Sequence, residues 1–140
     1  MRFEDGAALV VTIQMYGGMG VLPADWDDNP YYRLSEQKPS PLADAFDERH
    51  FAGLFEAPGA EKLSAKALLA TEQRVPGLGN GVLQDILFAA RINPRTKAAD
   101  LGAADRRRLY RAVTGTLRAM TEAGGRDTEL DLDGAPGGYV

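Results

Sequence analysis

The sequence predicts an α+β fold that is mostly helical, and three observations indicate it. Short apolar runs rich in β-branched residues occur within the first 22 residues. From residue 43 onward, apolar residues recur at helical spacing between capping and stop signals. The chain has 140 residues, of which 44% are hydrophobic. That size suits one domain with a real core, or one domain and a fragment of another.

The N-terminal part predicts a β-hairpin followed by a linker. Residues 8–13 are apolar and largely β-branched, Gly17-Gly18 can turn the chain, and residues 19–22 form a second apolar run. Residues 23–41 hold four prolines among polar and tyrosine residues, which indicates a linker. Two strands alone are marginally stable, so we expect the remnant of a larger β-sandwich. The expected division is therefore a hairpin and linker over residues 1–42 and a helical domain over residues 43–140.

Helices are expected at four places in the second part. The first covers about residues 43–56, where apolar side chains lie near helical spacing. Ser64 can cap a second helix that runs to about residue 72, and a third begins at residue 80 and ends near residue 90. The fourth covers about residues 103–122, followed by a Gly124-Gly125 stop. Its apolar positions 109, 113, 117 and 120 form one buried stripe.

The turn before residue 80 is the most informative feature. Residues 74–80 read Arg-Val-Pro-Gly-Leu-Gly-Asn and lead into an apolar-striped helix. Glycines let backbone amides approach a partner closely, and we expect Asn80 to be the N-cap of the helix. Free N–H groups and the helix dipole form an anion site, for which a phosphate is the natural ligand. From the residues alone, an ordinary glycine-rich helix cap explains the turn equally well.

Charge is distributed unevenly along the chain. The net charge of −4 argues against nucleic-acid binding, but residues 64–126 hold 11 basic and 5 acidic side chains. Residues 1–63 hold 5 basic and 11 acidic side chains, and residues 127–140 hold 4 acidic and no basic ones. The basic excess therefore coincides with the phosphate-type turn, as expected of a backbone-binding segment. The alternative is that the arginines at 106–108 and 111 solvate a long helix.

Composition excludes several kinds of site. The sequence has no cysteine, which rules out disulfides and a thiolate zinc site within it. Its single histidine, His50, is expected on a helix surface or half-buried rather than in a catalytic role. No apolar run approaches membrane-spanning length, and there is no signal-peptide pattern. We expect no membrane partner and a cytoplasmic location.

Several separate motifs, in order and spacing, resemble the helix-two-turns-helix module of the Fpg/Nei DNA glycosylases. The resemblance covers about residues 63–139, over half of the chain. The residues that carry it are Lys66-Ala67-Leu68-Leu69, Gln73, Val75, Gly77-Leu78-Gly79-Asn80, Ile86-Leu87-Phe88, Pro94, Leu101, Leu109, Leu117, Gly124-Gly125-Arg126-Asp127-Thr128 and Asp133-Gly134-Ala135-Pro136-Gly137-Gly138-Tyr139.

The resemblance implies a set of DNA-binding residues. Lys66 corresponds to a family lysine that contacts DNA phosphate, although a lysine is otherwise a surface residue by default. Asn80 corresponds to the asparagine that grips phosphate near the lesion together with amides of the turn at Gly77 and Gly79; an N-cap role is compatible with this.

Residues Gln14, Met15 and Tyr16 occupy the place of a family segment that fills the space of a flipped base. The family pattern there is Asp-Pro-Arg-Arg-Phe-Gly, of which this sequence keeps only the aromatic residue and the glycine. A polar tip, a flexible thioether and an aromatic ring still suit a wedge. The end of a strand that packs into a core is an equally good explanation.

The resemblance also implies features that this sequence lacks. Family enzymes carry an N-terminal proline amine that forms a Schiff base with the deoxyribose, followed by a glutamate, whereas this chain begins Met1-Arg2-Phe3. They usually end in a cysteine-ligated zinc finger. Because this sequence has no cysteine, we expect no zinc or other cofactor in this chain. We therefore expect the chain alone to lack glycosylase and lyase activity.

The function implied is the DNA-binding portion of a DNA glycosylase and AP lyase that acts in base excision repair of oxidised bases. The expected partner is double-stranded DNA, in damaged form, bound by a monomer. The alternative is a catalytically inactive, stand-alone paralogue that binds damaged or bent DNA. RNA binding is a third possibility, which the net acidity and the motifs beyond the turn disfavour.

Overall fold

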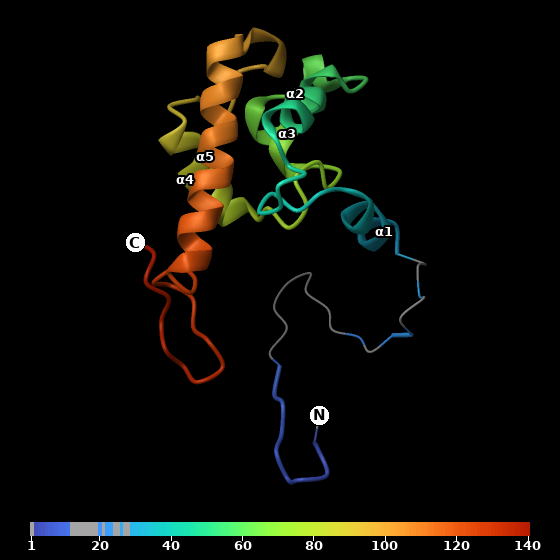
Figure 1. Cartoon of the computed structure of the whole chain (residues 1–140), viewed down its shortest axis with the longest axis vertical. Helices are drawn as coiled ribbons and strands as arrows, with labels where there is room; N and C mark the ends of the chain where they lie inside the picture. Colours follow the sequence, from blue (N-terminus) through green and yellow to red (C-terminus); the bar gives the residue numbers. More distant parts are fainter. Residues whose placement is uncertain (1, 12–19, 21, 24–25, 27–28) are drawn as a thin grey trace.

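The computed structural model describes residues 2–11, 20, 22–23, 26 and 29–140, and it is mostly helical there (Figure 1). The helices are α1 (Pro30–Gln37), α2 (Glu48–Glu56), α3 (Ala65–Ala70), α4 (Asn80–Ala89) and α5 (Ala103–Glu122). Two short 3-10 helices, η1 (Ala60–Lys62) and η2 (Ala98–Asp100), lie between them. The β-structure of these residues consists of isolated bridges. The α+β, mostly helical class is confirmed.

The N-terminal part differs from its prediction in two ways. Ala8 forms an isolated antiparallel bridge with Arg2, and residues 9–11 belong to no strand. Residues 12–19 and 21, where the rest of the predicted hairpin falls, lie outside the described residues. Within the predicted linker over residues 23–41 lies α1, a helix that was not predicted. Pro30 is the first residue of α1, where its missing N–H removes no helical hydrogen bond.

The predicted helix over residues 43–56 begins later than expected. Residues 43–46 form turns instead, in which the Phe46 N–H donates to the Ala43 carbonyl at 3.0 Å. Asp47 then caps α2 by accepting a hydrogen bond from the His50 N–H at 2.7 Å. Phe46 is nevertheless fully buried. Its apolar signal therefore reports burial in the core rather than membership of the helix.

Helix α5 has the predicted bounds and packs against both α4 and α2 (Figure 1). Leu109, Val113 and Met120 of the predicted stripe are buried, and Leu117 is partly buried. Thr116 joins them on the buried side. No helix in the described part of the chain is both long and apolar enough to cross a membrane.

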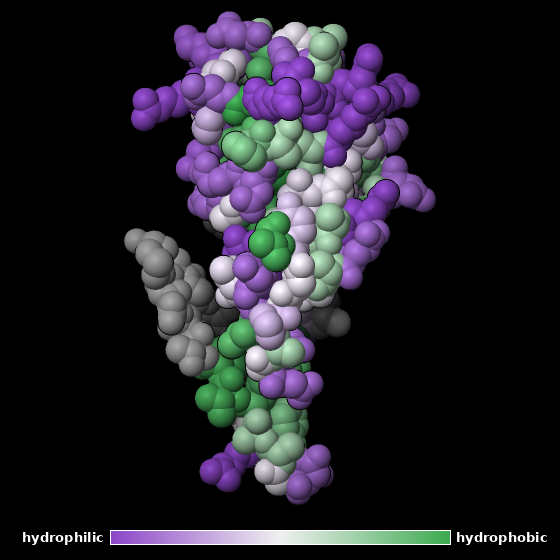
Figure 2. All heavy atoms as spheres, turned by 90° about the vertical axis from the view of Figure 1, so that its left-hand side faces the viewer, coloured by the Kyte–Doolittle hydropathy of each residue, from purple (hydrophilic) through white to green (hydrophobic). Residues whose placement is uncertain are grey.

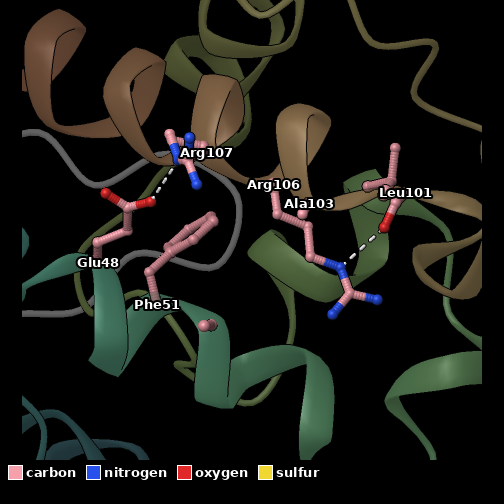
Figure 3. A pocket seen from close by; sticks show the side chains of 8 residues that line it. Glu48, Phe51, Leu101, Ala103, Arg106 and Arg107 are labelled. Carbon is pink, nitrogen blue, oxygen red and sulfur yellow. Dashed lines mark hydrogen bonds and ion pairs between the residues drawn. The ribbon is translucent and has the colours of Figure 1, made fainter.

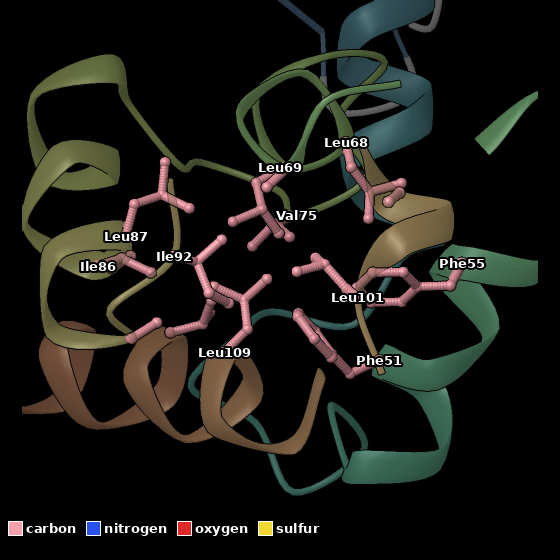
Figure 4. Packing of buried hydrophobic residues seen from close by; sticks show 14 of the residues in the cluster. Phe51, Phe55, Leu68, Leu69, Val75, Ile86, Leu87, Ile92, Leu101 and Leu109 are labelled. Carbon is pink, nitrogen blue, oxygen red and sulfur yellow. The ribbon is translucent and has the colours of Figure 1, made fainter. Parts of the chain in front are cut away.

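One core cluster joins the helices (Figure 4). Side chains from α2, α3, α4 and α5 meet in it, together with residues of the connections such as Val75, Ile92 and Leu101. Its largest fully buried members are Phe46, Phe51, Leu68, Leu69, Val75, Leu83, Ile86, Leu87, Leu109 and Val113.

The start of α3 is held by the segment that follows α4. The Ala65 N–H donates to the Thr96 carbonyl at 2.7 Å, and the Lys66 N–H donates to the Pro94 carbonyl at 3.1 Å. Ser64 caps α3 as predicted, because its hydroxyl accepts a hydrogen bond from the Ala67 N–H at 3.1 Å. Helix α3 ends at Ala70, two residues earlier than expected, and the chain then turns toward α4.

Candidate nucleic-acid interface

The connection between α3 and α4 is a tight turn with an unusual backbone. Glu72 and Gln73 have φ angles of 56° and 46°, and Gly77 has a φ of 76°. Left-handed backbone is easy for glycine but costs energy for residues with a side chain. Val75 is buried in the core and anchors the middle of the turn. The surrounding structure must therefore hold Glu72 and Gln73 in place.

Two basic side chains hold this turn, and neither role was predicted. Arg74 is only 8% exposed. Its guanidinium donates to the Thr71 hydroxyl at 2.7 Å and pairs with the Glu72 carboxylate at 2.6 Å. The Lys38 ammonium donates to the Glu72 carbonyl at 2.8 Å and the Gln73 carbonyl at 3.0 Å. Arg74 therefore stabilises the turn from within it, and Lys38 ties the turn to the segment directly after α1.

Asn80 is the first residue of α4, not its N-cap as predicted. The N-cap is Gly79, which has no side chain to accept a hydrogen bond. The amides at the start of α4 are therefore not capped by a side chain. Within the described residues, the N–H groups of Asn80, Gly81 and Val82 have no hydrogen-bond acceptor, and the exposed Asn80 side chain has no partner. These are the free donors expected at an anion site.

The two glycines of the turn have different structural reasons. Gly77 has a positive φ, so a side chain there would be strained. Gly79 has an ordinary φ of −83°, and a methyl group at its Cα would meet open space. Nothing in the folded chain therefore requires a glycine at position 79. A ligand that approaches the backbone closely would require it.

Lys66 lies on the first turn of α3, which packs against α4. Its side chain is half-buried, and its ammonium has no hydrogen bond or ion pair within the described residues. The structure thus places Lys66 and Asn80 on the first turns of two helices in contact. Gln14, Met15 and Tyr16 lie outside the described residues.

The arginines at the start of α5 are mostly engaged within the fold. The Arg108 Nε donates to the Ala90 carbonyl at 2.8 Å, and its guanidinium pairs with Asp105 at 2.6 Å. Arg107 pairs with Glu48 of α2 at 2.9 Å. These arginines therefore link α5 to α2 and to the end of α4, rather than only solvating their own helix as the alternative supposed.

A pocket of about 340 Å³ lies where the start of α5 meets α2 (Figure 3). Arg106 lines it, but its Nε donates to the Leu101 carbonyl at 2.8 Å and its guanidinium lies 4.5 Å from the centre of the Phe55 ring. On the opposite side Arg107 is paired with Glu48, as the dashed lines of Figure 3 show. Because both cations are occupied, this pocket is a weaker anion site than the turn before α4.

The surface on the side of α4 and α5 is divided by polarity (Figure 2). Hydrophilic residues gather over the upper part, and hydrophobic ones become more frequent toward the narrow lower end, where the terminal segments lie. Phe88 of α4 is 87% exposed and Leu132 of the C-terminal segment is 95% exposed.

In the described residues, no group of acidic, histidine or cysteine side chains could hold a metal ion.

Comparison with known proteins identifies relatives of the part of the chain that contains α2 to α5. Residues 38–131 match the family model described as formamidopyrimidine-DNA glycosylase H2TH domain. Formamidopyrimidine-DNA glycosylase of Thermus thermophilus is 34% identical over 124 residues, which is 86% of this chain and 45% of the relative. The protein of the same name from Rhodopseudomonas palustris is 36% identical over 132 residues, which is 89% of this chain and 43% of the relative.

A solved structure agrees with these matches. The crystal structure of MutM (Fpg) protein from Thermus thermophilus superposes with a TM-score of 0.68 at 35% sequence identity. The match covers 82% of this chain and 43% of that one. The chain thus spans about half the length of the curated relatives that it matches.

Proposed function

The chain belongs to the formamidopyrimidine-DNA glycosylase H2TH domain family, and from this membership we propose that it is the DNA-binding portion of a repair glycosylase. In this proposal it grips duplex DNA for a base excision repair reaction on oxidised bases. The observation that carries the proposal is the uncapped start of α4, where three amides and the Asn80 side chain have no partner among the described residues.

The proposed grip uses groups that the fold leaves unused. A DNA phosphate would accept hydrogen bonds from the amides of Asn80 and Gly81 and from the Asn80 side chain. Gly79 would let the phosphate approach, because it has no side chain and the space around its Cβ position is open. Lys66 would add a charged contact from α3.

The first experiment replaces Asn80 with alanine. We expect duplex binding to weaken by about 1.5–3 kcal/mol, because a hydrogen bond to a charged group is lost. Thermal stability should change little, since Gly79 and not Asn80 is the N-cap. Fluorescence anisotropy with a labelled duplex, in a salt titration, measures the binding. Arg49→Ala, on the exposed side of α2, is the control for a lost polar side chain elsewhere.

A second pair of variants separates a phosphate site from a plain helix start. Gly79→Ala should fold normally, because its φ is ordinary and its surroundings are open, yet it should bind DNA more weakly. Lys66→Ala should weaken binding and lower the dependence of affinity on salt by about one phosphate contact. If Gly79→Ala and Lys66→Ala both bind like the wild type, the turn only begins a helix.

Three finer points complete the proposal. The preferred partner is damaged duplex DNA, the chain binds it as a monomer, and Gln14, Met15 and Tyr16 support the opened base stack. An abasic-site analogue in the duplex should therefore bind more tightly than intact DNA, and Tyr16→Ala should reduce that preference. Light scattering of the complex should give one chain per duplex.

A further inference from the structure

Arg126 reaches from the segment after α5 to the first turn of α4. A Cβ atom built at Gly81 would lie 2.8 Å from Nη1 and 3.3 Å from Nη2 of Arg126. Gly81 is the second residue of α4 and directly follows Asn80. The guanidinium therefore rests on the helix turn that carries the free amides, and the missing side chain at position 81 leaves room for it.

Glu129 holds Arg126 in this place. Its Oε1 accepts hydrogen bonds from Nε at 3.2 Å and Nη2 at 2.9 Å, and its Oε2 accepts one from the Arg126 backbone N–H at 3.3 Å. The segment is also tied back to the end of α5, because the Gly138 N–H donates to the Ala123 carbonyl at 2.8 Å and the Tyr139 N–H donates to the Gly125 carbonyl at 3.0 Å. Within the described residues Nη1 has no hydrogen-bond acceptor, and it is the atom nearest to the Cβ position of Gly81.

The charge of Arg126 does not suit the dipole of α4. The start of a helix carries a partial positive charge, so a cation beside it is unfavourable. Asp85 of α4 and Asp127 also act on Arg126 electrostatically, but the strongest partner is Glu129. An anion on the amides of Asn80 and Gly81 would turn this arrangement into a favourable one, since it would lie between the free amides and the guanidinium.

We propose that Arg126 is a further residue of this interface that binds the DNA backbone. Glu129 positions its guanidinium when no DNA is bound and competes with the phosphate for it. This inference rests on the proposed function. In it, Nη1 donates to the phosphate that the α4 turn holds, or to the next phosphate along the strand. Planar guanidinium groups suit such contacts because they donate several parallel hydrogen bonds.

A purely structural clamp is the rival explanation, and it makes the opposite prediction for Glu129. If Arg126 contacts DNA, Glu129→Gln frees the guanidinium, and duplex binding should become several-fold tighter. If the pair only ties the segment down, Glu129→Gln should loosen it and leave binding unchanged or weaker. Glu122→Gln, an exposed change at the end of α5, controls for the lost negative charge.

The second arm replaces the arginine. Arg126→Gln should weaken binding by about tenfold and reduce the slope of log affinity against log salt by about one contact. Arg49→Gln on α2 removes the same charge from a surface remote in sequence and should have a much smaller effect. Thermal unfolding of each variant verifies that the fold is intact at the assay temperature.

The outcomes are distinct. An Arg126→Gln variant that binds with the wild-type slope overturns the inference, and so does a Glu129→Gln variant that binds no more tightly than Glu122→Gln. In either case the wild type and Asn80→Ala, measured in the same titration, still test the proposed function independently. A wild-type chain without salt-dependent duplex binding overturns both.

Discussion

His50 of α2 places a ring nitrogen beside the core residue Phe46. Its ring lies 5.3 Å from that of Phe46, and its Nε2 atom is buried without a hydrogen-bond partner among the described residues. A buried polar atom without a partner loses its hydration and gains nothing in return. The His50 side chain is half-buried, which is one of the two positions expected from the sequence.

We therefore predict that His50→Leu stabilises the protein. Removing the unpaired nitrogen should raise the free energy of unfolding by about 1 kcal/mol, because the desolvation penalty disappears while the apolar contacts stay. Urea denaturation followed by circular dichroism measures it. Arg49→Leu, at the exposed neighbouring position, should change stability much less. A clearly destabilised His50→Leu variant would mean that Nε2 has a partner in solution.

The pair of Arg126 and Glu129 makes a second prediction, which concerns pH. The hydrogen bonds from Arg126 lower the pKa of Glu129 below its ordinary value. A lowered carboxyl pKa contributes stability that is present above the ordinary pKa and is lost as pH falls through the pKa of the folded state. In Arg126→Gln the pKa of Glu129 should rise toward its ordinary value. An NMR titration of the Glu129 side-chain carboxyl measures this.

Among the helices, the sequence predicted best where local signals decide the structure. The bounds of α5 and the Ser64 cap follow from an apolar stripe and a hydroxyl in the right place. Helix α1 was missed because Pro30 was interpreted as a linker residue, whereas proline also suits a first helical turn. The roles of Lys38 and Arg74 could not be predicted, since they depend on left-handed backbone at Glu72 and Gln73, which are not glycines.

Helices α3 and α4 begin with different N-caps, Ser64 and Gly79, so substitutions at their starts should differ in cost. Ser64→Ala should lower the free energy of unfolding by about 1 kcal/mol, because the hydroxyl caps the Ala67 amide. Asn80→Ala should cost only a few tenths of a kcal/mol, because the side chain caps nothing in the described structure. Urea denaturation of both variants tests this. Equal losses for the two would restore Asn80 as the N-cap.

For the molecule as a whole, α5 connects the α3–α4 turn to the rest of the fold. It packs against α4 on one side and α2 on the other, and Leu109 and Val113 of its buried stripe belong to the same core as Val75 of the turn (Figure 4). The geometry of the candidate interface therefore depends on a core that is common to the helices. In contrast, the exposed Leu132 of the C-terminal segment makes little contribution to that core.

We predict that the helical part unfolds as one cooperative unit. Leu109→Ala should lower the free energy of unfolding by about 2–5 kcal/mol, because a fully buried side chain is removed from the centre of the core. Leu132→Ala should have almost no effect, because its side chain is 95% exposed. Circular dichroism in the far ultraviolet and in the near ultraviolet should give the same urea midpoint for each variant.

At temperatures where Leu109→Ala remains folded, its duplex affinity and salt dependence should equal those of the wild type, because Leu109 is fully buried and donates nothing to DNA. Separate unfolding transitions for the α3–α4 turn and for α5 would show instead that the interface folds independently of this core.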